Sequence, residues 1–336
     1  MRAVMSGGNL PEKNASSALK TIQVETNPPA FGQVVVDVRA AGVNRADVLQ
    51  ASGNYPPPPG ASHVLGLEFA GVVSAVGDGV TAFEVGQEVT GLTDSGAYAE
   101  QITIPDQLLL PIPASIDIVT AGSIMEAACT AWSNLYDVAH LNRGEVVLIH
   151  GGSGGVGSFA IQLAAARGAK VIATARNKER AQRCLELGAS HCFTYQTDNG
   201  ESLAVQLPEL ISQSTNGHGA DVIFDVLGAE YLDTHLDSLA DGGRLVVIGL
   251  QRGAKAPLNL GKLMSRRASI SGTTLRSRSL EQKAQIVRSV YEHVWPLIES
   301  GQITPIVHAM YPLEQAAQAH QALNSGEVFG KLLLTP

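Results

Sequence analysis

Residues 146–167 read V-V-L-I-H-G-G-S-G-G-V-G-S-F-A-I-Q-L-A-A-A-R, and this segment carries the clearest signal for the fold class. Residues 146–150 form an apolar run typical of a buried strand, and residues 158–167 place apolar side chains on one helical face. The glycines between them permit a tight turn and the close approach of a pyrophosphate, which the free N–H groups of a helix N-terminus attract. The stretch therefore predicts a dinucleotide-binding βαβ unit, with its contacts at Gly152, Gly154, Gly155, Val156 and Gly157.

Apolar strands alternate with amphipathic helices through the rest of the second half of the chain. Further strands are predicted at residues 170–174, 191–195, 221–226, 244–249 and 269–273. This alternation is typical of a parallel sheet, and six strands complete one doubly wound sheet in the order 3-2-1-4-5-6. We expect an α/β Rossmann domain over residues 123–299. The turns after its fourth and fifth strands should also approach the coenzyme, at Leu227, Gly228, Gly249 and Leu250.

The first third of the chain is β-rich. Strands predicted at residues 34–38, 70–76 and 101–104 are separated by turn signals, which favours a partly open barrel. Residues 54–60, N-Y-P-P-P-P-G, should form an extended surface loop because prolines lock φ and remove backbone donors. A lone strand at residues 331–334 is not needed by the six-stranded sheet. We therefore expect residues 1–122 and 300–336 to form the other domain.

The composition indicates an acidic protein with small-molecule partners. The chain has 336 residues, 45% of them hydrophobic, with a net charge of -8 and a pI near 5.6. It lacks the excess of basic residues that binding to nucleic acid requires. No run reaches the roughly 18 apolar residues of a membrane span, and no signal-peptide pattern is present, so we expect a cytoplasmic protein. Three cysteines are too few for a disulfide framework.

The residues after the second strand bear on the choice between NADH and NADPH. This strand ends in the letters A-T-A-R, without the acid that holds the ribose of NAD. Arg176, Lys178 and Arg180 stand at the start of the next helix, where cations oppose the helix dipole and a bound phosphate would relieve them. Tyr195, at the end of the neighbouring third strand, could donate to the same phosphate. The alternatives are a solvated basic helix start, partly offset by Glu179, and a tyrosine that only caps the core.

Several motifs outside the glycine loop carry a resemblance to a known family. They are Asn44-Arg45-Ala46-Asp47, Gly53-Asn54-Tyr55-Pro56-Pro57-Pro58, Gly66-Leu67-Glu68 and Leu275-Arg276-Ser277-Arg278. Over almost its whole length the chain resembles the zeta-crystallin-like quinone oxidoreductases of the medium-chain dehydrogenase/reductase superfamily, and most of all their stress-inducible branch. The resemblance implies a GroES-like catalytic domain beside the Rossmann domain, with catalysis in the cleft between them. It also implies a homodimer, formed through the uncovered edge of the sixth strand.

The same resemblance bears on metal binding. In the zinc alcohol dehydrogenases of this superfamily a Cys stands at the position of Asn44, a His at that of Leu67, and a four-cysteine lobe near residues 87–100. This chain has none of these residues. Catalytic zinc needs three protein ligands and structural zinc needs four, so we expect no zinc. The nine histidines show no metal-like spacing, and His150 is expected to pack against the glycine loop.

Without a metal to polarise it, the substrate must be electrophilic itself. A quinone fits, because its reduced anion is delocalised and water can protonate it, while NADPH would supply the hydride or electron. The sequence barely separates this reaction from the NADPH-dependent reduction of an alkenal or enone double bond. A non-catalytic NADPH-binding structural protein, as among the lens crystallins, is a further alternative.

The resemblance also implies roles for individual residues. It places Asn44 where the pocket floor meets the nicotinamide, Tyr55 at the pocket entrance on the proline loop, and Thr130 beside the nicotinamide. The alternatives are a turn former for Asn44, packing on prolines for Tyr55 and a bond to a backbone carbonyl for Thr130. The remaining implied coenzyme contacts are Phe329 and Lys331.

Overall fold

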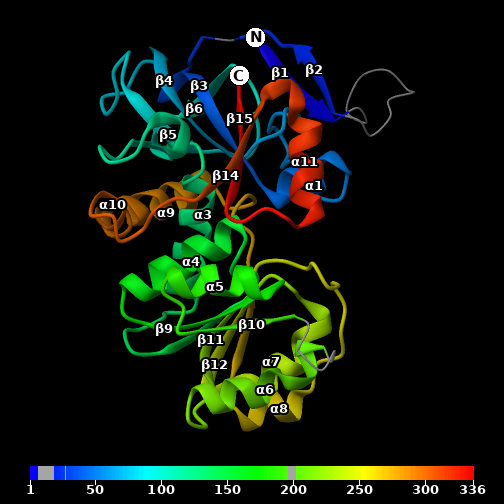
Figure 1. The fold of residues 1–336 in the computed structure, drawn as a ribbon. Coiled ribbons are helices and arrows are strands. Elements are labelled where there is room, and N and C mark those ends of the chain that lie inside the picture. The colour runs from blue at the N-terminus through cyan, green and yellow to red at the C-terminus, as the bar shows by residue number, and fades with distance from the viewer. Residues whose placement is uncertain (7–18, 27, 196–201) are drawn as a thin grey trace. The chain divides into compact units, whose positions relative to one another are not determined.

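The computed structural model describes residues 1–6, 19–26, 28–195 and 202–336, which form two compact units (Figure 1). The first unit comprises Met1–Cys129, Leu275–Gly301 and Pro305–Pro336, and the second comprises Thr130–Thr274 and Gln302–Thr304. The sequence assigns residues 123–129 and 275–299 to the second domain, whereas these segments lie in the first unit. Helical periodicity marks an apolar face but does not show which core that face joins.

The second unit is built on a parallel sheet with the strand order β10-β9-β8-β11-β12-β13. This order confirms the predicted doubly wound topology. The strand β12 begins five residues before the predicted position 244, because Leu239 pairs with Ala220 ahead of a register shift. The strands are β8 (Val146–Ile149), β9 (Lys170–Ala175), β10 (His191–Thr194), β11 (Ala220–Asp225), β12 (Leu239–Val247) and β13 (Ser269–Gly272).

The core of this unit forms because its central strands carry unbroken apolar runs, as expected for strands covered on both faces. Every residue of β8 is buried, and on one side Leu148, Ile223 and Leu245 join a core cluster with side chains from two helices. The helices of the unit are α4 (Gly155–Ala166), α5 (Lys178–Glu186), α6 (Leu203–Ser214), α7 (Leu232–Ser238) and α8 (Leu260–Ser265).

The first unit is β-rich. Its main sheet has the order β14-β15-β3-β4-β5-β7, β6 also pairs with β3, and β1 pairs with β2 separately. The predicted strands at residues 34–38, 70–76, 101–104 and 331–334 are β3, β4, β6 and β15. The strands are β1 (Arg2–Ser6), β2 (Leu19–Gln23), β3 (Gln33–Val43), β4 (Glu68–Val76), β5 (Glu88–Leu92), β6 (Gln101–Pro105), β7 (Leu109–Pro111), β14 (Val307–Pro312) and β15 (Lys331–Thr335).

The first unit also contains helices, and three of them, α9, α10 and α11, come from the C-terminal part of the chain. Residues 54–60 form neither helix nor strand, as the prolines predict. The indole of Trp295 donates to the carbonyl of Pro111 at 2.9 Å and so ties α10 to the end of β7. The helices are α1 (Arg45–Ala51), α2 (Ile118–Ala121), α3 (Met125–Trp132), whose last residues enter the second unit, α9 (Leu280–His293), α10 (Trp295–Glu299) and α11 (Ala316–Ser325).

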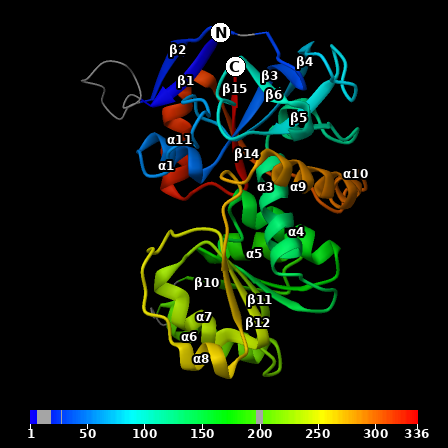
Figure 2. The same cartoon turned by 180° about the vertical axis from the view of Figure 1, so that it is seen from behind.

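Strand register in the first unit brings three polar residues to one place. Leu332 pairs with Val43, so Lys331 at the start of β15 stands beside Asn44 at the end of β3. Ala41 pairs with Phe69, so Glu68 at the start of β4 stands at the same end of the sheet. In the strand order β15 lies between β14 and β3, and both views show these three strands within the first unit (Figures 1 and 2). The sheet therefore gathers residues that are up to 287 positions apart in the sequence.

Two general expectations can be compared with the described residues. The cysteines Cys129, Cys184 and Cys192 are free thiols, the first two of them buried. Across the described part of the chain, no helix has both the length and the apolar character required to cross a membrane.

Candidate functional site

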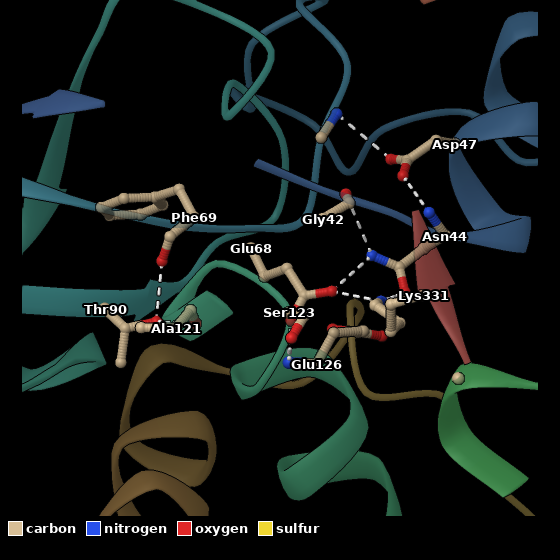
Figure 3. Close-up of polar contacts among 12 residues, drawn as sticks. Gly42, Asn44, Asp47, Glu68, Phe69, Thr90, Ala121, Ser123, Glu126 and Lys331 are labelled. Atoms are coloured by element: carbon tan, nitrogen blue, oxygen red, sulfur yellow. Dashed lines mark hydrogen bonds and ion pairs between the residues drawn. The ribbon is translucent and has the colours of Figure 1, made fainter. Parts of the chain in front are cut away.

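A buried ammonium ion lies at the centre of the polar site in the first unit (Figure 3). The Nζ atom of Lys331 donates to Asn44 Oδ1 at 2.6 Å and to Glu68 Oε1, and Asn44 Nδ2 donates to Glu68 Oε1 at 3.0 Å. Lys331 is 5% exposed and Glu68 is fully buried. A buried charge is tolerated only when it is paired and hydrogen-bonded, and here each charge meets both conditions. We call Asn44, Glu68 and Lys331 the Lys331 cluster.

Gly42 makes room for this arrangement. A methyl group on Gly42 would lie 2.2 Å from Oε1 of Glu68, so no larger residue fits at this point of β3. The Lys331 cluster thus depends on a glycine two residues before Asn44. Asn44 is also the N-cap residue of α1, so the turn-forming role considered from the sequence holds together with its bonds to two charged groups.

Asp47 is a second buried carboxyl group next to the Lys331 cluster. Its oxygens accept hydrogen bonds from the backbone N–H of Asn44 at 2.8 Å, the backbone N–H of Gly66 at 3.1 Å and the hydroxyl of Tyr98 at 3.1 Å. Burial raises the pKa of Asp47 to about 6, although these bonds and Lys331 oppose the rise. Asp47 therefore fixes the start of α1 and the Gly66 turn on either side of Asn44.

Tyr55 is held by an arginine as well as by its proline loop. The guanidinium carbon of Arg276 lies 5.3 Å from the centre of the Tyr55 ring, and Nη1 donates to the Tyr55 carbonyl at 3.3 Å. Arg276 also donates to Gln50 Oε1 at 2.6 Å and to the carbonyl of Asp94 at 2.5 Å. A half-buried tyrosine stacked under a guanidinium has a fixed orientation. Packing on prolines alone does not describe it.

The glycine loop of the second unit has the geometry that a pyrophosphate requires. A methyl group on Gly157 would lie 2.2 Å from the carbonyl oxygen of Gly151, and one on Gly152 would lie 2.9 Å from Ile161 Cδ1. The loop is therefore packed as tightly as glycine allows. The N-cap of α4, Gly154, has no side chain to satisfy the first N–H groups, which leaves them and the positive end of the helix dipole open to an anion. Gly155 and Val156 form the first turn of this helix.

The basic residues at the start of α5 differ in exposure. Arg176 and Lys178 are exposed, whereas Arg180 is 8% exposed, and its Nη1 donates to the hydroxyl of Ser153 at 3.5 Å. Asn177 caps the helix by accepting from the Arg180 backbone N–H at 3.0 Å. Arg180 thus reaches the glycine loop itself, while the other two cations lie at the surface.

Tyr195 bonds to the glycine loop in this structure. Its phenol oxygen accepts from the Gly151 N–H at 3.0 Å and from the Thr174 hydroxyl at 2.8 Å. These two bonds use its oxygen as an acceptor, and the phenol proton is still available for donation. Burial raises the pKa of Tyr195 to about 12, so the phenol stays protonated.

A chain of buried polar groups continues behind the loop. Thr174 Oγ1 lies 3.0 Å from His150 Nδ1, and His150 Nε2 lies 3.0 Å from His235 Nε2. His150 thus packs behind the glycine loop as predicted. Burial and His235 keep the pKa of His150 well below its usual range, so the ring is neutral. Asp225, whose carboxyl lies 4.0 Å from His235 Nδ1, could complete a set of three metal-ligand groups, but the two imidazoles already bond to each other.

The turn after β11 is held by Asp225, the last residue of that strand. Asp225 accepts from the backbone N–H of Leu227 at 2.7 Å and of Gly228 at 3.0 Å. Gly228 has a φ of 83°, and a methyl group there would lie 2.6 Å from the Gly253 carbonyl. Leu250, by contrast, is 57% exposed and Gly249 is half-buried. The predicted contacts at these turns therefore range from buried backbone to an exposed apolar side chain.

Two predicted contacts lie elsewhere. Thr130 is buried on α3, and its own carbonyl accepts from Asn134 Nδ2 at 2.8 Å, where the helix continues into a π-helical turn. Phe329 is 2% exposed, just before β15.

The residues of the first unit do not fit a catalytic zinc ion. Asn44 stands where the zinc enzymes have a cysteine, and both polar atoms of its amide are hydrogen-bonded within the Lys331 cluster. Leu67, at the histidine position, is 1% exposed and has no ligand atom. The ammonium of Lys331 lies 2.6 Å from Asn44 Oδ1, and its positive charge would repel a divalent cation at this place.

A tight glycine loop at a helix N-terminus that follows a parallel strand is typical of dinucleotide-binding proteins. Residues 30–114 match the alcohol dehydrogenase GroES-like domain, and residues 155–293 match the zinc-binding dehydrogenase family. The quinone oxidoreductase of Rattus norvegicus is 34% identical over 308 residues, which cover 91% of this chain and 90% of the rat protein. The chain therefore belongs to the quinone oxidoreductase family of medium-chain dehydrogenases/reductases.

Other similar proteins differ in length and function. The phthioceranic/hydroxyphthioceranic acid synthase of Mycobacterium tuberculosis is 37% identical over 309 residues, but the match covers 91% of this chain and only 14% of the length of that relative. The structure of Escherichia coli quinone oxidoreductase complexed with NADPH aligns with a TM-score of 0.87 at 29% identity, over 100% of both chains. That of CurK enoyl reductase aligns with a TM-score of 0.84 at 26% identity, over 99% of this chain and 98% of that chain.

Sequence reasoning missed several residues of these two regions. Glu68 enters the sequence analysis only as part of a motif, and Glu126, His235 and Asp225 do not enter it as site residues. One signal was present: Glu126 is the only charged residue in α3, M-E-A-A-C-T-A-W. Its backbone N–H donates to Glu68 Oε2 at 3.0 Å. A single acid in a buried apolar helix indicates a polar partner elsewhere in the fold.

We expect Lys331→Met to lower the free energy of unfolding by about 3–5 kcal/mol, because it leaves the buried carboxylate of Glu68 without its counter-ion. The measurement is urea-induced unfolding at neutral pH. Lys262→Met is the matched control: Lys262 also contacts two carboxylates, those of Asp233 and Asp237, but lies nearer the surface. Its loss should change the free energy by at most about 1 kcal/mol.

The double variant Lys331→Met/Glu68→Gln removes both charges and should recover part of the stability lost in the single variant. If it is no more stable than Lys331→Met, the loss does not come from an uncompensated carboxylate, and the ion pair is not what stabilises this end of the sheet.

Proposed function

We propose that this chain is a zinc-independent oxidoreductase that uses NADPH to reduce quinones. The observation that carries the proposal is the Lys331 cluster, in which a buried ammonium ion and a fully bonded Asn44 take up the place of metal ligands. A substrate in such a site receives no activation from a metal, and quinones need none. The identity to quinone oxidoreductases supports this substrate class.

NADPH, when bound, supplies a hydride from its nicotinamide ring. We propose that the glycine loop binds the pyrophosphate through the N–H groups of α4, and that Asn44 and Thr130 contact the nicotinamide. The amide of Asn44 is held in one orientation by Glu68 and Lys331, so it can present a fixed edge to a ligand. The other coenzyme contacts of this proposal are Leu227, Gly228, Gly249, Leu250, Phe329 and Lys331.

The preference for NADPH is proposed from the start of α5. Arg176 and Lys178 are exposed and can approach a 2′-phosphate, while Arg180 connects the same helix start to Ser153 of the glycine loop. No acid follows β9 directly to hold the ribose hydroxyls of NAD. The similarity to a structure complexed with NADPH supports this choice.

A second candidate is the NADPH-dependent reduction of an enone or alkenal double bond. The likeness to CurK enoyl reductase and the match to the phthioceranic/hydroxyphthioceranic acid synthase support it. Such a reaction uses the same coenzyme and likewise proceeds without a metal. It differs in its need for a proton at carbon after hydride transfer.

A homodimer through β13 is also part of the proposal. Among the described residues, β13 pairs with β12 alone and is the last strand of the sheet. The backbone N–H and C=O groups on its outer edge can therefore pair with a strand of a second copy.

The test of the proposed function is turnover of NADPH with an ortho-quinone and with an α,β-unsaturated ketone. We expect the quinone to give the higher kcat/KM. Tyr55→Ala should lower that value about tenfold, or ~1.4 kcal/mol, and change NADPH affinity less than twofold, because Tyr55 belongs to the proposed substrate pocket. Tyr291→Ala, at an exposed tyrosine of α9, is the control.

Faster turnover of the ketone would favour the double-bond reductase. Saturable NADPH binding with no turnover of either class would instead favour the non-catalytic protein. Unchanged quinone kinetics in Tyr55→Ala would remove Tyr55 from the pocket.

Coenzyme choice gives a separate prediction. Arg176→Ala should weaken NADPH binding about 10- to 100-fold and leave NADH binding unchanged, because a charge-assisted contact to phosphate contributes roughly 1.5–3 kcal/mol. Arg180→Ala should weaken both coenzymes, since it also loses the bond to Ser153 of the glycine loop. Titration of coenzyme fluorescence measures both affinities. Arg183→Ala, near the other end of α5, serves as the control.

An equal loss of NADPH and NADH affinity in Arg176→Ala would mean that this arginine is a solvated part of the helix start. The NADPH preference should also weaken as salt concentration rises, because an exposed contact is screened.

A further inference from the structure

Glu126 is the one residue of α3 that is not buried. The other seven residues of the helix are buried, whereas Glu126 is partly exposed. Its side chain extends toward the side of the site occupied by Lys331 (Figure 3). Glu126 also precedes Thr130 by four residues on the same helix, so the two lie on one helical face. Thr130 is a proposed nicotinamide contact, which brings Glu126 close to the reacting end of the proposed coenzyme.

The polar groups around Glu126 direct their hydrogen bonds to other acceptors. Lys331 donates two of its three ammonium protons to Glu68 and Asn44, and the backbone N–H of Glu126 itself donates to Glu68 Oε2 at 3.0 Å. The carboxylate of Asp47 accepts hydrogen bonds from three other donors, which are the backbone N–H groups of Asn44 and Gly66 and the hydroxyl of Tyr98. Within the described part of the chain, no hydrogen bond reaches the carboxyl group of Glu126. This carboxyl group therefore lacks the donors that would stabilise its charged form.

The surrounding charges also favour the protonated form. Burial raises the pKa of Glu126 to about 8, and the neighbouring carboxylates of Glu68 and Asp47 raise it further than Lys331 and Arg276 lower it. Tyr55 also interacts electrostatically with Glu126, whose negative charge contributes to raising the pKa of the phenol. Below this pKa the carboxyl holds its proton, so Glu126 is mostly protonated at neutral pH and loses the proton as the pH rises through about 8.

We propose that Glu126 is the proton donor that completes the reduction of α,β-unsaturated carbonyl substrates in this site. This inference rests on the proposed function and names the proton donor for its second candidate, the reduction of a double bond. After the substrate has accepted a hydride at its β-carbon, it is an enolate with one new C–H bond. The O–H bond of Glu126 then breaks and a C–H bond forms at the α-carbon, which leaves Glu126 as a carboxylate. Water returns the proton, and the oxidised coenzyme leaves as NADP⁺.

Two further points concern this role: how Glu126 releases its proton, and which substrates need a proton donor. The nearby ammonium ion favours the carboxylate that remains after proton transfer, so the donor is not trapped in its protonated form. A reduced quinone is a delocalised oxygen anion that water protonates readily. The proton donor should therefore matter for enones and not for quinones.

The test compares wild type with Glu126→Gln, which keeps the size of the side chain and removes the acid. We expect kcat for an enone to fall about 100-fold, while kcat for a quinone changes less than about threefold. In wild type, kcat for the enone should decrease as the pH rises through about 8, and this decrease should be absent in Glu126→Gln. Glu281→Gln, at an exposed acid of α9, is the matched control.

A second readout does not depend on activity or coenzyme. Infrared spectroscopy of the wild-type protein at pH 7 should show the C=O band of a protonated carboxyl, which disappears as the pH rises through about 8 and is missing in Glu126→Gln. Glu126→Asp, which keeps an ionisable proton, should retain part of the enone activity. Circular dichroism of each variant verifies that it is folded.

Equal enone rates in wild type and Glu126→Gln would overturn the role of Glu126 alone. So would a wild-type protein that reduces quinones but no enone. A wild-type protein that reduces neither class would overturn the proposed function together with this inference.

Discussion

The buried ammonium ion of Lys331 is the constraint on which the proposed substrate site depends. A charge that is 5% exposed requires an opposite charge and further acceptors, and Glu68 and Asn44 supply both. They can do so because β3, β4 and β15 bring three chain segments to one end of the sheet. The ion pair then fixes the Asn44 amide, and its ammonium ion opposes the binding of a divalent cation. The proposed metal independence and the proposed role of Glu126 thus depend on the same buried charge.

In the second unit, a chain of polar side chains supports the glycine loop. The Gly151 N–H donates to Tyr195 and Thr174, and His150 and His235 continue this chain into the core. The open N–H groups of α4 are thereby presented to a pyrophosphate from a rigid support. Asp225 performs the same task for the turn at Leu227 and Gly228.

Much of the fold could be predicted from local sequence patterns. The central strands carry apolar runs and the glycine loop has a characteristic spacing, so the strand order of the parallel sheet could be predicted from them. The partners of the site residues could not be predicted in the same way. Lys331 and Asn44 are 287 residues apart and His150 and His235 are 85 apart, and no periodic pattern records such pairs. The helices α9 and α10 show an apolar face, but only the tertiary structure shows that it packs in the first unit.

We propose that this chain carries out reduction without a metal ion, because the ammonium ion of Lys331 lies beside Asn44, at the position of a zinc ligand in the zinc enzymes. The most direct measurement is elemental analysis of purified protein that is active with NADPH and a quinone, combined with activity after dialysis against a strong chelator. We expect far less than one zinc per chain and full activity after dialysis. One zinc per chain, with activity that disappears on chelation and returns on adding zinc, would contradict it.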